Sequence, residues 1–520
     1  MSMMEFFLNY FLDIKPLLFV LGLYLFYKYG QTKQNLHIKV GHKGPPPWPY
    51  IGNFIDIFRF GVHEMDIMNH KKYGNIYPFY LGNIRSCIVS DEKILKQILI
   101  KEAKYFTDRL DIGFNGKSTE KMLTVLKGKD WERVRNLVSP TFTSGKLKKM
   151  SPLIADGVNL LEKRIIEYPT DTPIDFKEFF GSLTMDVIAR TMFGMHIDTQ
   201  TNPKNMFMIQ AKKLFNVSAI NPLILIFLFF PELAGLVKKI IPKWEFFGRS
   251  TFQFFNNNLY KAIEEREKLK DDGREYNDFL ALMLKAHKEV DESDPNQLHN
   301  MDSKSLTNQE IMAQSLIFLL AGFETTATTL TFLSYFLAKN PNYQREVYDE
   351  IVDSIGVDDE ITYETLIKMR LLDAAISETL RICPPASRID RACTQDVVLT
   401  ASDGSKITAN KGDVFTVPIY SIHMDSSIWP NPNKFDIHRF DDENKKTRGA
   451  YSFMPFGMGP RNCVGMRFAL LEVKWAIVTI LQKFEIVPCP ETLDELKFKK
   501  SGLTAPIKPI LLKVVKRSQN

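Results

Sequence analysis

The sequence lacks several features that would assign it to a common class of protein. It has five cysteines in 520 residues, an odd and widely spread set that favours a reducing compartment over a disulfide framework. Its 67 Lys and Arg against 61 Asp and Glu leave a net charge of +6, too small for so large a chain to indicate nucleic-acid binding. It has no Gly-x-Gly-x-x-Gly after a strand-like run, so nothing in it is typical of a nicotinamide or flavin site. Internal repeats and low-complexity tracts are also absent.

The N-terminal stretch is apolar without matching the usual transmembrane pattern of about 18 uncharged residues. Leu17 to Tyr27 is an unbroken run, but Glu5, Asp13 and Lys15 dilute the residues before it. No small-x-small cleavage site follows Tyr27, which argues against a cleaved signal peptide. Four lysines come next and favour a cytosolic body by the positive-inside rule: Lys28, Lys33, Lys39 and Lys43. We predict that residues 1–29 are an uncleaved signal anchor.

We predict that residues 30–53 are a basic and proline-rich linker. Gly44-Pro45-Pro46-Pro47-Trp48-Pro49 cannot be helical, because successive prolines fix the backbone and remove hydrogen-bond donors. We therefore expect a stiff hinge there, followed by one domain from 54 to 520.

The body is predicted to be mainly helical with small antiparallel sheets. Apolar and polar residues alternate in Ile76–Ser90 and Val397–Pro418, which predicts two hairpins. A period of 3.6 residues predicts helices over Lys146–Tyr168, Phe176–Phe193, Phe246–Lys268 and Asn277–His287. The stretch 288–305 is polar and is predicted to be a solvated loop. The apolar run Leu223–Phe230 fits either a buried helix or a segment that dips into a bilayer.

One loop near the C-terminus has the composition of a ligand for a soft metal. Phe456-Gly457-Met458-Gly459-Pro460-Arg461-Asn462-Cys463-Val464-Gly465 places glycines before a single thiol, and a helix-like run follows from Met466 to Leu481. Helix N-termini favour thiolates. A lone cysteine is more often a small buried hydrophobe, and zinc is disfavoured because no second Cys or His stands nearby.

The pattern Phe-x-x-Gly-x-Arg-x-Cys-x-Gly resembles the haem-binding loop of the cytochromes P-450. The resemblance implies the P-450 fold and a haem b with Cys463 as its thiolate ligand. It also implies that Phe456 packs beside the sulfur, that Arg461 reaches a haem propionate, and that Pro455 and Gly465 border the cofactor.

A long predicted helix carries a second motif. Thr307-Asn308-Gln309-Glu310 has the spacing of a capping box, and the apolar period continues to about Ala338. In its middle stands Ala321-Gly322-Phe323-Glu324-Thr325-Thr326, where small residues leave room for a flat macrocycle. Thr325 could instead bond to the preceding turn while Glu324 faces solvent. The resemblance implies that Thr325 and Glu324 deliver protons for oxygen activation.

Two further sets of residues become functional candidates only through the resemblance to the family. Glu378 and Arg381 lie three residues apart on a helix-like segment, a weak signal by itself. The resemblance makes them, with Arg439, a buried structural network, although Ile437-His438 replaces the usual Pro-Glu. Trp131 and Arg135, four apart, would hold a haem propionate, together with Arg109 and Arg391.

Arg388-Ile389-Asp390-Arg391 and Pro460 to Leu470 look most like the drug- and steroid-oxidising family 3 branch. The analogy implies a lipophilic small-molecule substrate (steroid, fatty-acid or xenobiotic type). It implies a pocket of Ile112, Phe114, Phe215, Phe318, Ala321, Ala386, Ser387 and Leu503. An isomerase or dehydratase that rearranges a lipid peroxide without external electrons is the alternative.

The resemblance also implies partners and a location. A monooxygenase of this kind takes NADPH electrons through NADPH-cytochrome P-450 reductase, with cytochrome b5 as a second candidate donor. An acidic reductase could dock on a basic face, for which the candidate residues are Lys146, Lys148, Lys149, Lys434, Lys445, Lys446 and Arg448. The expected location is the endoplasmic reticulum membrane, with the catalytic domain in the cytosol and no nucleic-acid partner.

Overall fold

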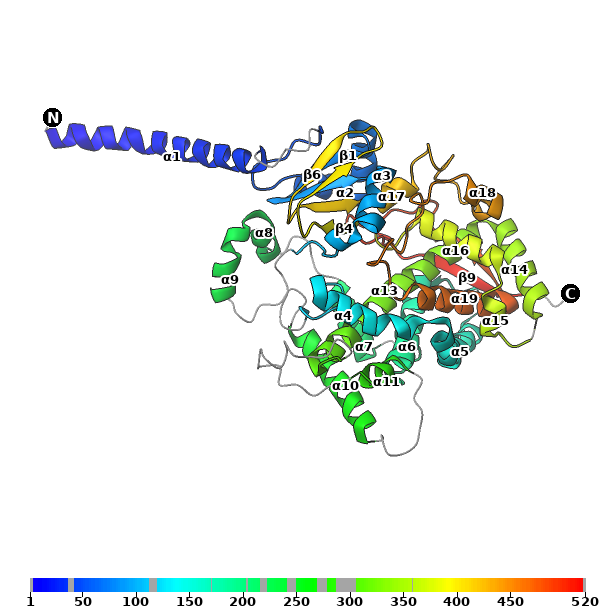
Figure 1. The fold of residues 1–520 in the computed structure, drawn as a ribbon. Helices are drawn as coiled ribbons and strands as arrows, with labels where there is room; N and C mark the ends of the chain where they lie inside the picture. Colours follow the sequence, from blue (N-terminus) through cyan, green and yellow to red (C-terminus); the bar gives the residue numbers. More distant parts are fainter. Residues whose placement is uncertain are drawn as a thin grey trace.

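The structure is a computed structural model that describes residues 3–35, 42–111, 119–169, 171–202, 204–215, 222–240, 249–268, 278–286, 305–357 and 359–517. Figure 1 shows a mainly helical body with small sheets, from which the N-terminal helix projects. Two predicted pocket residues, Ile112 and Phe114, lie outside the described residues, as does most of the stretch 288–305.

The helices are α1 (Met3–Asn35), α2 (Phe54–Tyr73), α3 (Glu92–Lys96), α4 (Gly128–Val138), α5 (Ser144–Glu167), α6 (Phe176–Phe193), α7 (Met206–Phe215), α8 (Pro222–Phe229), α9 (Ala234–Ile240), α10 (Arg249–Lys268), α11 (Phe279–Leu284), α13 (Asn308–Lys339), α14 (Pro341–Ile355), α15 (Tyr363–Leu366), α16 (Arg370–Ile382), α17 (Ile419–His423), α18 (Asp442–Lys446) and α19 (Met466–Lys483). The strands are β1 (Ile76–Leu81), β2 (Ile84–Val89), β3 (Ile174–Asp175), β4 (Ile389–Ala392), β5 (Val397–Thr400), β6 (Lys406–Ala409), β7 (Val414–Val417), β8 (Phe484–Pro488) and β9 (Leu511–Lys516).

The strands form three small sheets, in the orders β1-β2-β7-β4, β3-β9-β8 and β5-β6. The two predicted hairpins are confirmed as β1–β2 and β5–β6, both antiparallel. The prediction that the sheets are purely antiparallel is wrong, because β7 leaves the second hairpin and pairs in parallel with β2. A parallel partner must come from a distant part of the chain, so local alternation could not reveal it.

The central helix α13 is buried along nearly its whole length, and α6 packs along it. Its predicted capping box is confirmed, since the Glu310 amide donates to Thr307 Oγ1 (3.1 Å) and the Thr307 amide donates to Glu310 Oε2 (3.0 Å). Gly322 leaves room at this contact, because a Cβ there would collide with Cδ1 of Ile188 in α6, at the end of a side chain that can shift. Gly322 also lines the cavity described below, where the sequence linked it to cofactor space.

Helix α8 contains the apolar run predicted to be either core or membrane-dipping. Phe227 and Leu228 are buried, and Asn83 Nδ2 donates to the Phe229 carbonyl at 2.6 Å, so this end of α8 is packed on the body. The exposed apolar side chains follow it, with Leu236 56% and Ile240 69% exposed in α9. The C-terminal end of α8 is thus packed, and these exposed apolar side chains lie in α9.

Candidate functional site

The cysteine loop is shaped by two glycines in the left-handed region. Gly457 and Gly459 have φ values of 69° and 78°, and the Cys463 amide donates back to the Phe456 carbonyl at 2.8 Å. A Cβ on Gly459 would collide with the Leu99 carbonyl, so this glycine also permits close approach of another segment. The loop closes directly before α19, whose N-cap is Gly465.

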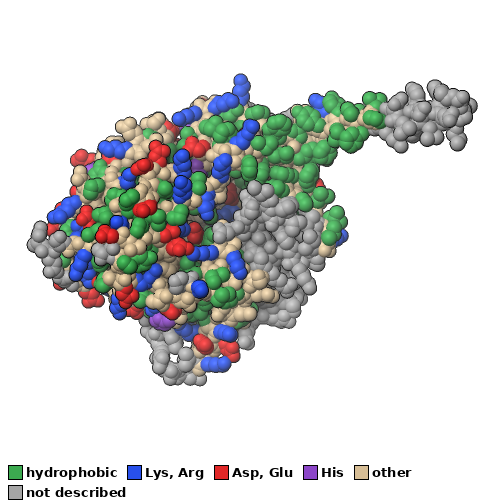
Figure 2. Space-filling view, turned by 180° about the vertical axis from the view of Figure 1, so that it is seen from behind, with side chains coloured by type: hydrophobic (Ala, Val, Ile, Leu, Met, Phe, Trp, Pro, Cys, Tyr) green, Lys and Arg blue, Asp and Glu red, His purple; other side chains and the backbone are tan. Residues whose placement is uncertain are grey.

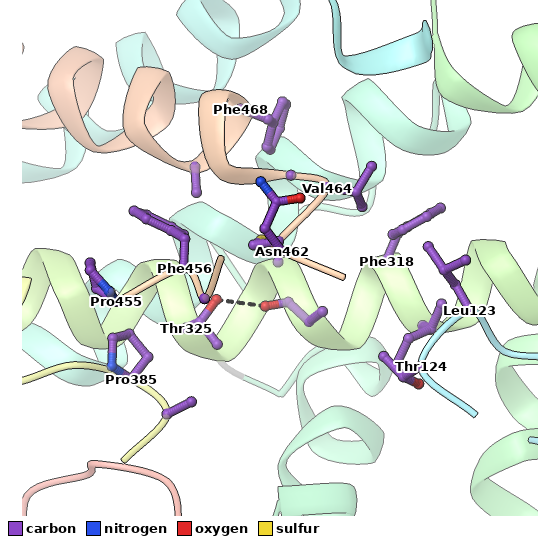
Figure 3. A pocket seen from close by; sticks show the side chains of 18 of the residues that line it. Leu123, Thr124, Phe318, Thr325, Pro385, Pro455, Phe456, Asn462, Val464 and Phe468 are labelled. Atoms are coloured by element: carbon purple, nitrogen blue, oxygen red, sulfur yellow. Dashed lines mark hydrogen bonds between the residues drawn. The ribbon is translucent and has the colours of Figure 1, made fainter. Parts of the chain in front are cut away.

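A cavity of about 380 Å³ lies between this loop and α13, within the usual range for small-molecule sites (Figure 3). Cys463 opens into it from one side, and Ala321 and Thr325 of α13 form part of its lining. The structure brings together all of the predicted cofactor-binding residues in this lining: Arg109, Trp131, Arg135, Ala321, Arg391, Pro455, Phe456, Arg461, Cys463 and Gly465.

The Cys463 side chain is exposed toward the cavity. Burial raises the pKa of its thiol, while the backbone amide of Gly465 and the charges of Arg135 and Arg109 lower it less strongly. The Gly465 amide at the start of α19 therefore acts in the direction that the sequence predicts, but burial outweighs it in the protein by itself. A bound cation would stabilise the charged sulfur.

Four arginines line the cavity without a carboxylate partner among the described residues. Arg461 donates to the carbonyls of Leu123 (3.2 Å) and Leu126 (2.6 Å), and its guanidinium lies 4.2 Å from the Trp131 ring centroid. Arg135 donates to Asn462 Oδ1 at 2.8 Å, whereas Nε of Arg109 is buried without a hydrogen-bond partner.

The charges of these arginines act on one another. Burial, followed by the charges of Arg109 and Arg391, lowers the pKa of Arg461 to about 9. Burial and Arg109 lower the pKa of Arg391 to about 10. A buried cationic cluster of this kind is stabilised by an anion, and carboxylates suit the guanidinium geometry. The donor set thus fits a ligand with carboxylates at its rim and a thiolate-binding metal at its centre, as in haem.

Thr325 and Glu324 lie in different environments. Thr325 lines the cavity, and its hydroxyl donates to the Ala321 carbonyl at 2.7 Å, the back-bond drawn in Figure 3. The Glu324 carboxylate is instead paired with Lys177 Nζ of α6 at 2.8 Å. Lys177 also donates to Thr328 Oγ1 at 2.5 Å, and burial lowers its pKa. Sequence reasoning missed Lys177, because nothing local links α6 to α13.

The predicted substrate residues are only partly brought together. Phe318 and Ala386 line the cavity. Ser387 turns away, since its hydroxyl donates to the Gly502 carbonyl at 2.8 Å, and neither Leu503 nor Phe215 is in the lining. Phe215 lies against Phe323 instead, with 6.0 Å between ring centroids. The analogy named these residues without giving the direction of each side chain.

The predicted structural network is present as a set of contacts. Arg381 donates from Nε and NH2 to the two oxygens of Glu378 (2.7 and 2.8 Å), and both side chains are fully buried. Arg439 Nε lies 3.3 Å from Glu378 Oε1. Arg381 also donates to the carbonyls of His423 and Pro432, which ties α16 to the chain before the cysteine loop.

Several lining residues escaped the sequence analysis. Phe468, Ala469 and Val473 lie on one face of α19 and could have been found from the helical period after Cys463. Arg388 also lines the cavity, but Asp66 of α2 neutralises it, with 2.6 Å between Nε and Oδ2. The residues 66 and 388 are far apart in the chain, so no sequence signal joins them.

Comparison with known proteins places this site in a family. Residues 43–514 match the family model for Cytochrome P450. The chain is 38% identical to cytochrome P450 3A9 of Rattus norvegicus over 505 residues, which cover 97% of each chain. It is also 38% identical to cytochrome P450 3A31 of Mesocricetus auratus (96% of each chain) and to cytochrome P450 3A29 of Sus scrofa (95% of each). The chain therefore belongs to the cytochrome P450 family and is a monooxygenase that acts on lipophilic substrates.

Proposed function

We propose that this monooxygenase binds haem b in the cavity beside α13, with Cys463 as its thiolate ligand. The observation that carries the proposal is a thiol facing a cavity whose border holds four arginines that form no ion pair with a carboxylate among the residues that the structure describes. When bound, the haem supplies the activation of molecular oxygen and the insertion of one oxygen atom into a C–H bond.

The side chains around the cavity have distinct tasks in this proposal. Arg109, Arg135, Arg391 and Arg461 would hold the two carboxylates of the cofactor. Phe456 lines the cavity beside Cys463, and its carbonyl accepts the Cys463 amide, which fixes the position of the sulfur. Apolar side chains on the α13 and α6 side, including Phe318 and Ile188, bind the lipophilic part of the substrate.

Thr325 and Glu324 are proposed to deliver protons to the reaction. The Thr325 hydroxyl oxygen faces the cavity and can accept a hydrogen bond from a water while its proton bonds to Ala321. Glu324 is held by Lys177, so its carboxylate must leave this ion pair before it can pass a proton toward the cavity. Lys177 thereby determines when the Glu324 side chain is available to transfer a proton.

Electrons are proposed to come from NADPH through a reductase, with cytochrome b5 as a second donor. The exposed members of the basic set, such as Lys149, Lys434, Lys445 and Lys446, suit an acidic partner. Arg448 does not belong to this surface, since its guanidinium lies 4.3 Å from the Trp429 ring centroid. Lys148 is paired with Glu364.

We further propose that α1 anchors the protein in the endoplasmic reticulum membrane. Among the described helices, α13 is long and apolar enough to cross a bilayer, but 72% of its apolar window is buried and it is the core helix described above. α1 does not meet that criterion, yet its side chains from Leu17 to Tyr27 are about half exposed or more, for example Phe19 at 68%. Figure 2 shows these apolar side chains continuing onto the body.

The ligand assignment can be tested with the carbon monoxide difference spectrum of the purified protein. Cys463→Ser should abolish the thiolate-type band, because the hydroxyl is a poor soft ligand. Cys489→Ser, at a half-buried cysteine outside the cavity lining, is the matched control and should retain the band. An unchanged spectrum in Cys463→Ser would exclude the assignment. Substrate oxidation that proceeds without NADPH and reductase would exclude the proposed electron supply.

A further inference from the structure

Tyr50 in the proline-rich segment has an unusual backbone conformation. Its φ is 62°, in the left-handed region, which costs a residue with a side chain about 1 kcal/mol or more. The conformation is imposed by a tight loop, since Trp48 and Gly52 exchange backbone hydrogen bonds of 2.9 and 2.7 Å. Strain of this kind persists where the surrounding contacts compensate for it.

The loop that carries Tyr50 is fixed to the body. Asn53 Nδ2 donates to the carbonyls of Pro45 and Pro46 at 3.3 Å, and Asn53 Oδ1 accepts from the Tyr80 amide at 2.9 Å. The Asn53 amide donates to the Tyr80 carbonyl at 2.7 Å. The proline-rich segment, which the sequence predicts to be a stiff hinge, is therefore attached to β1.

The Tyr50 side chain reaches α1. Its ring stacks on Phe26 with centroids 4.3 Å apart and an interplanar angle of 16°, and its hydroxyl donates to the Phe26 carbonyl at 2.8 Å. Gly30, one turn further, is the buried residue among the described side chains of α1, and a Cβ there would collide with the Tyr50 ring. The glycine forms a slot for the tyrosine ring.

The same ring also borders the α8 segment. Tyr50 and Phe230 have ring centroids 5.5 Å apart, and Phe54 meets Phe229 edge to face at 5.4 Å. The backbone N–H of Asn83 donates to the Leu228 carbonyl at 3.2 Å. This hydrogen bond holds the α8 segment on the β1–β2 turn. Three separate parts of the chain thus meet around one tyrosine.

We infer that Tyr50 is a rigid joint that sets a fixed angle between α1 and the body, and so sets how the body lies on a lipid surface. The exposed apolar side chains Trp48 and Phe58 of the body and Leu236 of α9 would be held in a constant relation to the anchor. The lipid part of this inference rests on the proposed membrane attachment, whereas the joint itself does not.

The test is a distance measurement on the full-length protein in lipid nanodiscs. Spin labels carried on non-canonical residues replace Gly22, which has open space around it, and Glu64, which is exposed on α2, so that the native cysteines remain. We expect one narrow distance distribution. Tyr50→Ala should abolish the narrow peak, and Tyr50→Phe, which removes only the hydrogen bond, should broaden it less.

A second variant changes the contact between α1 and Tyr50 from the α1 side. Gly30→Leu fills the slot and should broaden the distribution while leaving the loop around Tyr50 intact. Trp48→Ala, at a side chain 58% exposed in the same loop, is the control and should keep the narrow peak. A broad distribution in the unmodified protein, or a narrow one in both Tyr50→Ala and Gly30→Leu, would overturn the joint. Vesicle flotation of the same variants reports separately on membrane attachment, which all of them should retain.

Discussion

At the scale of single residues, Gly459 bears the most severe steric constraint in the cysteine loop. Gly459→Ala should destabilise the protein by several kcal/mol, about the range for overpacking plus strain, because its Cβ would collide with the Leu99 carbonyl. Gly457→Ala has a similar positive φ, but its nearest neighbour would be 3.6 Å away, so only about 1 kcal/mol is expected. Thermal unfolding of both variants measures the difference. Equal losses in the two would refute the role of the Leu99 contact.

The residues of the cavity were predictable to different degrees. Cys463 and Arg461 belong to one short motif, so their proximity follows from the loop itself. Arg109 and Arg391 come from distant segments, and only the family pattern could assign them. Lys177 and Asp66 carry no local signal, because their ion pairs with Glu324 and Arg388 depend entirely on how helices pack. Charge pairing between distant elements is therefore the part of the site that the sequence could not supply.

At the scale of elements, the Glu378–Arg381 pair connects α16 to the chain around η5 (Ile437–Phe440). Glu378→Gln should destabilise the protein by about 3–5 kcal/mol, because it leaves a fully buried guanidinium without its counter-charge. The control is Glu364→Gln, whose partner Lys148 is exposed, and there a much smaller loss is expected because solvent screens the pair. Chemical denaturation compares the two. A small effect in Glu378→Gln would show that the network is dispensable for stability.

His423, at the end of α17, should make the protein sensitive to acid. Its Nε2 accepts from the Met454 amide at 3.0 Å while Nδ1 faces the Arg381 carbonyl at 3.2 Å, an arrangement that requires the neutral ring. Burial, then the charge of Arg381, lowers its pKa from 6.5 to about 3. As the pH falls below about 6.5, the unfolded chain takes up this proton first, so folding stability decreases until about pH 3.

The acid effect can be measured as the drop in thermal midpoint between about pH 7.5 and about pH 5. His423→Gln should shrink that drop, since an amide can donate and accept without titrating. A drop of the same size in His423→Gln would assign the acid sensitivity to other groups.

Secondary structure was largely predictable, and its assembly was not. The helix Phe176–Phe193 was predicted to the residue from its apolar period, and the structure shows that the Asp175 side chain caps its N-terminus. The parallel pairing of β2 with β7 was not, since alternation shows that a strand exists without showing which strand lies beside it. For the same reason no sequence signal showed that Gly322 packs against Ile188 of α6.

At the scale of the whole molecule, attachment to membrane should survive loss of the anchor. A chain without residues 1–29 should still float with lipid vesicles, because exposed apolar side chains remain on Trp48, Phe58, Leu236 and Ile240. Replacing Leu236 and Ile240 with Asp in that truncated chain should release it. Val398→Asp, at an equally exposed residue on β5, is the control and should not. A truncated chain that never floats would contradict a second contact with lipid.

The sheet β3-β9-β8 pairs residues 174–175 with residues 511–512, which lie on either side of α13 and the cysteine loop in the sequence. During synthesis on the ribosome, β3 emerges long before β9, so β3 lacks its partner strand until nearly the whole chain has been made. A nascent chain arrested before residue 511 would contain the cysteine loop but could not complete this sheet.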